Sequence, residues 1–177
     1  MRACDIAVVG LGLMGAATLR ALAARGADVL GFDPLAVGER RGSSHGSCRV
    51  FRRFNFENPA YTALSDRAFA GWRALEAESG TTILMPCPVL EAGPRGSALI
   101  DGSRAATSGA AMTGPSTGGE ANAVFPAFRL PDDWDVVVQD DGGILLAEAA
   151  LRALGARSAT ASRPAPHGSS QQPAAFG

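Results

Sequence analysis

The side chains best suited to chemistry are concentrated in residues 42–54, which read GSSHGSCRVFRRF. This stretch holds three serines, one of the chain's two histidines, a cysteine and three arginines. Such residue types could form a nucleophile with its base, a basic patch for nucleic acid, or a loop that binds a cofactor. The elements that come before the stretch must decide between these three kinds of site.

Two of the three interpretations have little support. A serine hydrolase is disfavoured because no G-x-S-x-G motif follows a predicted strand and no acid is placed to orient His45 as a base. A nucleic-acid patch is disfavoured because Arg49, Arg52 and Arg53 have no surrounding basic field with interleaved aromatic residues. The formal net charge of -1 also provides no long-range attraction for nucleic acid.

A strand, a glycine turn, a helix and a second strand precede the stretch. Residues 5–9, DIAVV, form a short apolar run that is typical of a parallel strand buried on both faces. Residues 10–15 read GLGLMG, and residues 16–25 are rich in alanine and leucine and end at a glycine, which predicts a helix. Residues 27–33 form a second apolar run. The sequence therefore predicts a βαβ unit.

The glycine turn predicts a dinucleotide site. In G-x-G-x-x-G, Gly10 permits the tight turn, Gly12 lets a pyrophosphate approach the backbone, and Gly15 lets the helix pack on the strand. Asp33 ends the second strand, where its carboxylate can accept hydrogen bonds from a ribose and disfavours a 2'-phosphate. The predicted cofactor-binding residues of this unit are Gly10, Gly12, Leu13, Met14, Gly15 and Asp33.

The turn alone does not separate NAD from FAD. GLGLMG is also similar to the 3-hydroxyisobutyrate dehydrogenase family, so an NAD-dependent dehydrogenase fragment is an alternative, as is a non-catalytic dinucleotide-binding module. A nicotinamide domain should continue with βα units joined by short loops. Residues 34–58 instead form a long polar loop, and a helix follows over 59–80.

The rest of the chain divides into patterned and unpatterned segments. One or two strands are predicted over 81–92, a strand over 134–139, a turn over 140–143 and a helix over 147–154. The predicted organisation is a dinucleotide-binding N-terminal region over 1–100, a linker or damaged segment over 101–121, a strand-turn-helix continuation over 122–155 and a disordered tail over 156–177.

The chain resembles the FAD-dependent amine oxidases of the monomeric sarcosine oxidase and N-methyltryptophan oxidase family, within the D-amino-acid-oxidase-like flavoproteins. The resemblance is carried by VVGLGLMG, by Asp33, by GSSHG followed by two arginines three residues apart, and by FPAFRLPDDW with DGGILLAEAALRAL. It covers residues 5–100 and 120–154, and only the N-terminal part of a family member. The implied fold is α/β, with an incomplete Rossmann-like FAD-binding βαβ domain, part of a substrate-domain β element and the disordered tail. The resemblance implies that residues 1–100 are the FAD-binding N-terminal region with the start of the substrate domain.

The resemblance implies roles for the opening stretch. Ser43 and Ser44 would contact a phosphate or the flavin edge, and His45 would lie near the flavin as a further cofactor-binding residue. His45 and Arg49 are the expected catalytic residues, because positive charge or hydrogen-bond donors stabilise the reduced, anionic flavin. Arg52 is expected to bind the substrate carboxylate through two parallel hydrogen bonds.

The implied activity is oxidation of the C–N bond of a secondary or N-methyl amino acid, with oxygen reduced to hydrogen peroxide. In the family a lysine activates oxygen and a cysteine tethers the flavin, both in the half that this chain does not match, and the chain contains no lysine. We therefore expect a truncated product with little or no turnover. Our hypothesis is that frameshifts produced residues 101–119 and 156–177, which resequencing would test.

The expected partners are an amine or amino-acid substrate and molecular oxygen, with no nucleic acid and no membrane. The longest apolar runs fall far short of the roughly 20 residues that a membrane helix requires. The three cysteines are widely spaced, without a C-x-x-C pair, and no secretory leader is present. These features predict a cytoplasmic protein without a metal site.

Overall fold

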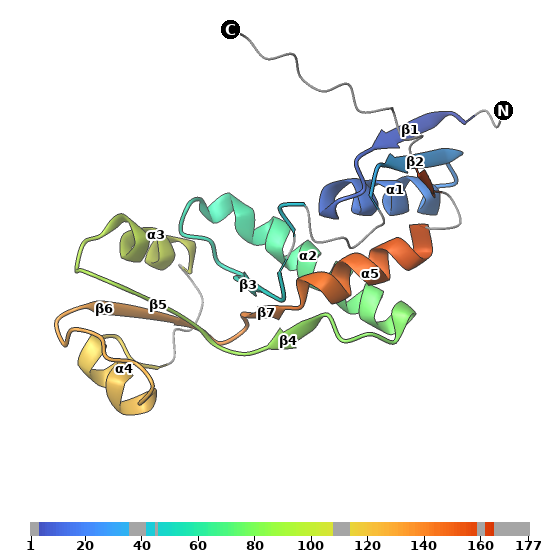
Figure 1. Ribbon diagram of the computed structural model, residues 1–177. Helices are drawn as coiled ribbons and strands as arrows, with labels where there is room; N and C mark the ends of the chain where they lie inside the picture. The colour runs from blue at the N-terminus through green and yellow to red at the C-terminus, as the bar shows by residue number, and fades with distance from the viewer. Residues whose placement is uncertain (1–3, 36–41, 45, 108–113, 159–161, 165–177) are drawn as a thin grey trace, which may run out of the picture. The chain divides into compact units, whose positions relative to one another are not determined.

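The computed structural model describes most of the chain, and these residues form two compact units (Figure 1). The described ranges are 4–35, 42–44, 46–107, 114–158 and 162–164. The first unit comprises residues 1–46 and 147–177, and the second comprises residues 47–146.

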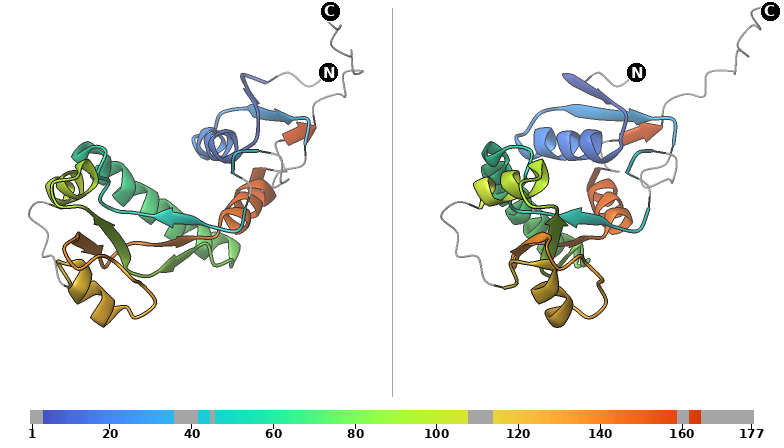
Figure 2. Two further views of the ribbon diagram at one scale, coloured as in Figure 1. Left: turned by 60° about the vertical axis from the view of Figure 1, so that its left-hand side comes forward. Right: turned by 90° about the vertical axis from the view of Figure 1, so that its left-hand side faces the viewer.

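The first unit contains the predicted βαβ element. Strand β1 (Ile6–Val9) leads through the glycine turn into helix α1 (Leu13–Ala24), and strand β2 (Val29–Asp33) returns parallel to β1. Figure 2 shows α1 running alongside these two strands. Leu11, Leu19 and Val29 form the buried core between helix and strands. The α/β fold class predicted from the sequence is confirmed.

Strand β1 is less buried than its apolar sequence predicts. In the sheet order β1-β2-β8, it occupies an edge, and Val9 is 84% exposed. The prediction that residues 5–9 are buried on both faces is therefore wrong for this chain. A parallel strand is covered on both faces only where other layers of the fold pack on it, and the described residues do not cover Val9.

The predicted disordered tail begins too early. Helix α5 (Ala147–Ser158) continues beyond residue 154 and packs against α1. Strand β8 (Ser162–Pro164) then pairs in parallel with β2. Strand pairing uses hydrogen bonds of the backbone and therefore does not require apolar side chains. The remainder of the predicted tail, residues 165–177, lies outside the described residues.

The second unit contains two antiparallel sheets. Strands β3 (Arg49–Phe51) and β4 (Leu84–Pro86) flank β7 (Gly143–Leu145), and β5 (Val89–Gly93) pairs with β6 (Asp135–Gln139). The strands predicted over 81–92 and 134–139 are confirmed. Strand β7 was not predicted, because its first residue falls in the predicted turn over 140–143.

The long helix of the second unit begins and ends where its sequence signals lie. A short 3-10 turn, η1 (Pro59–Tyr61), leads into α2 (Thr62–Ser79). The Asn58 side chain accepts a hydrogen bond from the Ala60 N–H at 2.9 Å, which caps the start of the turn. Gly80 ends the helix with a left-handed φ of 67°. The predicted helix over 59–80 is confirmed.

The predicted linker contains two helices. Helix α3 (Ala98–Ala106) and helix α4 (Gly118–Val124) lie largely within residues 101–121 or overlap them. One face of α3 is buried through Ile100, Ser103 and Ala106. A methyl group at Gly102 would overlap the carbonyl oxygen of Phe56, so small residues let this helix approach the neighbouring loop closely. The segment predicted as linker or damaged is thus helical at both ends, since a scarcity of large apolar residues can reflect close packing, and its residues 108–113 lie outside the described residues.

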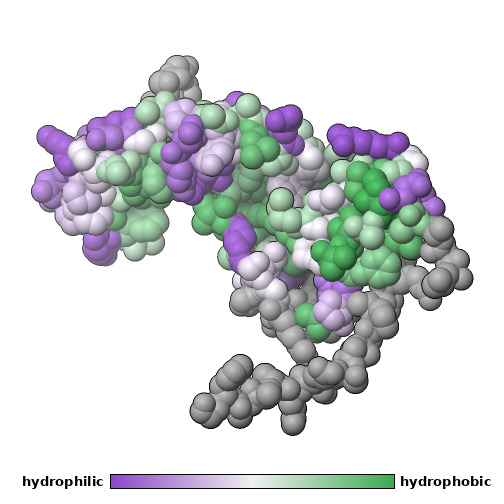
Figure 3. All heavy atoms as spheres, turned by 90° about the horizontal axis from the view of Figure 1, so that it is seen from above, coloured by the Kyte–Doolittle hydropathy of each residue, from purple (hydrophilic) through white to green (hydrophobic). Residues whose placement is uncertain are grey.

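Aliphatic side chains also reach the surface of the second unit. Val50, Ile144 and Met85 are exposed, and their strand registers place them side by side across β3, β7 and β4. Figure 3 shows hydrophobic atoms in green at the surface among purple hydrophilic ones. An open face of an antiparallel sheet normally carries polar residues, so this aliphatic row is unusual.

Glu76 connects the end of α2 to the start of β4 through hydrogen bonds. Its Oε1 accepts hydrogen bonds from the N–H groups of Ile83 at 2.7 Å and Leu84 at 2.8 Å, and its Oε2 accepts from Arg73 at 2.6 Å. Burial acts to raise the pKa of Glu76, but these three donors outweigh it and hold the pKa below its ordinary value.

We expect Glu76→Gln to lower the free energy of unfolding at pH 7 by about 1–2 kcal/mol, because charged acceptors make stronger hydrogen bonds. Because the pKa of Glu76 is lower in the folded state than in the unfolded state, the charged carboxylate stabilises the fold fully at pH values above the unfolded-state pKa. This stabilisation is lost as the pH falls through the folded-state pKa and the carboxylate becomes protonated. Urea denaturation at pH 7 and in the acid range would show the difference shrinking in acid. A constant difference would contradict this assignment.

Candidate functional site

The glycine turn has the backbone geometry that a phosphate site requires. Gly10 has a φ of 89°, a left-handed conformation that favours glycine, and its N–H donates to the Phe32 carbonyl at 2.8 Å. Gly12 is the N-cap of α1, and Leu13 and Met14 begin the helix. The first N–H groups of a helix have no acceptor within the helix and point outward. They can therefore donate to an anion.

Gly15 and Gly12 serve this turn in different ways. A methyl group at Gly15 would overlap the carbonyl oxygen of Gly10, so only glycine lets α1 pack this closely on the turn. A methyl group at Gly12 would meet no atom within 4 Å. The space beside Gly12 is therefore open to a ligand, while the space beside Gly15 is filled by the protein. This arrangement fits the pyrophosphate of a dinucleotide.

Asp33 joins the second strand to the glycine turn. Its Oδ2 accepts a hydrogen bond from the Leu11 N–H at 2.6 Å, and its Oδ1 accepts from the Leu35 N–H at 2.8 Å. A carboxylate offers about four acceptor positions, so each oxygen can accept a further hydrogen bond from a ribose hydroxyl. The contact with Leu11 was not predicted from the sequence, and it fixes the carboxylate beside the turn.

The GSSHG segment is described in part. Ser43 is exposed and Ser44 is half-buried, and Gly46 has a φ of 104°, which favours glycine. His45 lies outside the described residues. The roles of Ser43, Ser44 and His45 toward a cofactor therefore stay predictions.

The arginines that follow belong to the second unit and differ in their surroundings. Arg49 begins β3 opposite Leu145, and its exposed side chain donates to the Cys48 carbonyl at 2.7 Å. Arg52 follows the strand, and its guanidinium bonds two carboxylates: Nη1 to Glu91 at 3.0 Å and Nη2 to Glu57 at 3.2 Å. Arg52 is thus bound to two carboxylates of the chain itself, and its role toward a substrate carboxylate stays a prediction.

The two carboxylates on Arg52 lie in different environments. Glu91 is buried, with 7% of its surface exposed, whereas the Glu57 side chain is 45% exposed. The Arg52 guanidinium also lies over the Phe56 ring, 5.3 Å from its centre. Glu91 therefore holds the inner side of the guanidinium, and Glu57 holds the side that reaches solvent.

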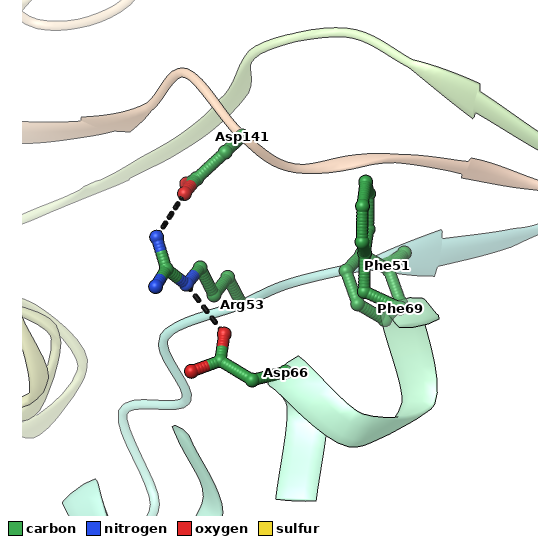
Figure 4. Close-up of a pocket in the computed structure, with 5 residues that line it drawn as sticks. All are labelled: Phe51, Arg53, Asp66, Phe69 and Asp141. Carbon is green, nitrogen blue, oxygen red and sulfur yellow. Dashed lines mark hydrogen bonds and ion pairs between the residues drawn. The ribbon is translucent and has the colours of Figure 1, made fainter. Parts of the chain in front are cut away.

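Arg53, which had no assigned role, links two elements. Its Nε donates to Asp66 of α2 at 2.6 Å and its Nη1 donates to Asp141 at 2.5 Å (Figure 4). The hydrogen bonds to Asp66 and Asp141 outweigh partial burial and raise the pKa of Arg53. With Phe51 and Phe69 these residues line a pocket of about 260 Å³. Because the three charged groups are partly exposed, their ion pairs contribute little stability.

Neither a metal site nor a membrane span is found in the part of the chain that the structure describes. No group of three or more His, Cys, Asp or Glu residues could hold a metal ion there. Its helices are all too short or too polar to cross a bilayer.

The family model described as FAD dependent oxidoreductase (DAO) matches residues 5–162. The chain belongs to this family. Its members depend on FAD, so the resemblance seen in the sequence is confirmed and the NAD-dependent dehydrogenase alternative loses its support. The match runs from β1 to the start of β8 and therefore includes the glycine turn, Asp33 and the GSSHG segment.

Individual DAO-family relatives give the same assignment. The chain is similar to monomeric sarcosine oxidase of Bacillus sp. (strain B-0618), with 30% identity over 151 residues, 84% of this chain and 39% of the relative. It is similar to N-methyl-L-tryptophan oxidase of Yersinia pestis (strain Pestoides F), with 28% identity, 85% of this chain and 41% of the relative.

A solved structure in the same group also matches. NikD, an unusual amino acid oxidase essential for nikkomycin biosynthesis, matches with a TM-score of 0.78 and 25% identity over 93% of this chain and 44% of that chain. The chain therefore spans about two fifths of the length of these relatives. Its fold and family are shared with them over that portion.

Proposed function

We propose that this chain forms the FAD-binding and carboxylate-binding portion of an oxidase that acts on the C–N bond of a secondary or N-methyl amino acid. The observation that carries the proposal is the glycine turn, which leaves open space beside Gly12 and has the Asp33 carboxylate hydrogen-bonded to it. The names of the sarcosine and N-methyltryptophan oxidases support the substrate class.

The βαβ element would hold the ADP half of FAD. The N–H groups at the start of α1 would donate to the pyrophosphate, and Asp33 would accept from the ribose. Ser43, Ser44, His45 and Arg49 are the residues we expect at the flavin end. When bound, FAD supplies the acceptor for a hydride equivalent from the substrate C–N bond and passes two electrons to oxygen, which gives hydrogen peroxide.

Arg52 would bind the substrate carboxylate. Glu57 already occupies the outer side of its guanidinium with a partly exposed carboxylate. An incoming amino acid could take the place of Glu57 without disturbing the buried bond to Glu91. The oxidised product is an imine, which water would hydrolyse to the free amine and a carbonyl compound.

Turnover by the chain alone is a separate question. The family resemblance assigns oxygen activation to a lysine, and this chain has none. We therefore expect FAD and carboxylate binding but little or no production of hydrogen peroxide. An oxygen electrode with sarcosine as substrate would measure this directly.

Arg52→Lys tests the carboxylate site. Lysine keeps a positive charge beside Glu91 but lacks the planar fork that binds a carboxylate through two parallel bonds. We expect the dissociation constant for sarcosine to rise about tenfold, measured by calorimetric titration or from the NMR shift of the position-52 side chain.

Arg53→Lys is the matched control, because it makes the same change one residue away on a side chain that bonds only partly exposed carboxylates, Asp66 and Asp141. Its dissociation constant for sarcosine should stay close to that of the unaltered chain. Equal effects of the two substitutions would remove the support for Arg52 as the carboxylate site.

A further inference from the structure

Three polar side chains are buried within the sheet formed by β5 and β6, and two of them, Glu91 and Gln139, are hydrogen-bonded to each other. Glu91 lies in β5 with 7% of its surface exposed, and Gln139 ends β6 with 2% exposed. Their hydrogen-bond partners all lie outside these two strands, except for the bond between them. Buried polar groups need such partners, because an unpaired one costs free energy. The partners show what the pair holds in place.

Gln139 fixes the backbone of the loop that carries Arg52. Its Oε1 accepts a hydrogen bond from the Phe54 N–H at 3.0 Å, and its Nε2 donates to the Phe54 carbonyl at 2.9 Å. The side-chain amide thus pairs with both backbone groups of one residue, as a neighbouring strand would. Phe54 lies two residues after Arg52, so this contact anchors the backbone next to the guanidinium.

Glu91 fixes the guanidinium itself. Its Oε1 accepts from Arg52 at 3.0 Å, and its Oε2 accepts from the Ser103 hydroxyl at 2.7 Å and from Gln139 Nε2 at 3.2 Å. The carboxylate that holds Arg52 is therefore oriented by two buried donors from other elements. Gln139 therefore forms hydrogen bonds with two groups that position Arg52, the Phe54 backbone and the Glu91 carboxylate.

We propose that Gln139 is a positioning residue for Arg52. It orders the 52–54 segment before the ligand arrives and orients Glu91 so that the outer side of the guanidinium faces Glu57 or a substrate carboxylate. Ordering the site in advance lowers the free energy lost on binding, since each mobile side chain or loop must otherwise be immobilised by the ligand. This inference rests on the proposed role of Arg52.

A positioning role for Gln139 and a purely structural role predict different effects of substitution on binding. Buried ionic groups can often be replaced by apolar residues without loss of stability, so stability alone does not explain why the buried carboxylate of Glu91 is bonded to both Arg52 and Gln139. A positioning role predicts that disturbing Gln139 weakens carboxylate binding beyond what an equal loss of stability would cause. The test therefore compares a Gln139 variant with a core variant of the same strand, and measures the free energy of unfolding of both beside their binding.

The test measures sarcosine binding by Gln139→Met and by Val136→Ala. Methionine keeps the length of glutamine and removes its three hydrogen bonds, without changing the net charge near Arg52. Val136 is in the same strand but belongs to the core with Ala121 and Val138, away from Glu91. We expect the dissociation constant to rise about three- to tenfold in Gln139→Met and to stay unchanged in Val136→Ala.

Hydrogen exchange supplies a second readout. The amides of residues 52–57 should exchange faster in Gln139→Met than in Val136→Ala. If Gln139→Met does not fold, Gln139→Asn makes the same comparison, because its amide is one methylene too short to reach Phe54. An unchanged dissociation constant in a folded Gln139 variant would overturn the inference while Arg52→Lys still weakens binding. An unchanged value in Arg52→Lys would instead contradict the proposed carboxylate site.

Discussion

Gly15→Ala should strongly destabilise the first unit. The new methyl group would overlap the carbonyl oxygen of Gly10, which is backbone and cannot rotate away. Helix and turn must move apart, and such overpacking costs about 3 kcal/mol. Urea denaturation, followed by circular dichroism, would measure the loss as a lower midpoint.

Gly71→Ala is the matched control for this substitution. Gly71 also lies inside a helix, α2, and a methyl group there would meet no atom within 4 Å. Alanine is a better helix former than glycine by about 0.5–1 kcal/mol, so this variant should be slightly more stable. Gly15→Ala with a midpoint as high as that of Gly71→Ala would show that α1 does not pack on the turn in this way.

Gly12→Ala should have its effect on cofactor binding and not on stability. Gly12 has a φ of -63°, which alanine adopts readily, and its methyl group would project into open space. That space is where the proposed pyrophosphate would approach the backbone. We expect FAD affinity to fall about 30-fold, equivalent to about 2 kcal/mol, with an unchanged urea midpoint.

Fluorescence titration with FAD would measure this loss. The contrast with Gly15→Ala separates the two roles of glycine in the turn, since one substitution should affect folding and the other binding. If Gly12→Ala binds FAD as tightly as the unaltered chain, the turn is not the phosphate site. The family membership would stand, but the assignment of the ADP half to residues 10–15 would fall.

Local sequence signals predicted the βαβ element well. The spacing of Gly10, Gly12 and Gly15 between two apolar runs predicts a turn in which each glycine has a different steric requirement, and the structure shows those requirements at Gly10 and Gly15. Gly80 likewise ends α2 in the left-handed conformation that its residue type suggests. Such signals succeed because they depend on backbone conformation within a few residues.

The hydrogen-bonded residues that hold Arg52 in place, Glu91, Ser103 and Gln139, could not be predicted in the same way. They come from β5, α3 and β6, which are far apart in the sequence, and Ser103 lies in a segment that was interpreted as a linker. One signal was available: Glu91 is a single acid in the apolar strand Val89–Gly93. A charge in such a position must be paired when buried, but the sequence does not identify Arg52 as its partner.

The central claim is that the first unit binds FAD through its glycine turn, and one absorbance spectrum tests it most directly. The purified chain is mixed with FAD, desalted and scanned in the visible range, beside Gly12→Ala treated identically. We predict that the unaltered chain retains a flavin band and that Gly12→Ala loses most of it. A folded, unaltered chain that emerges colourless would contradict the account.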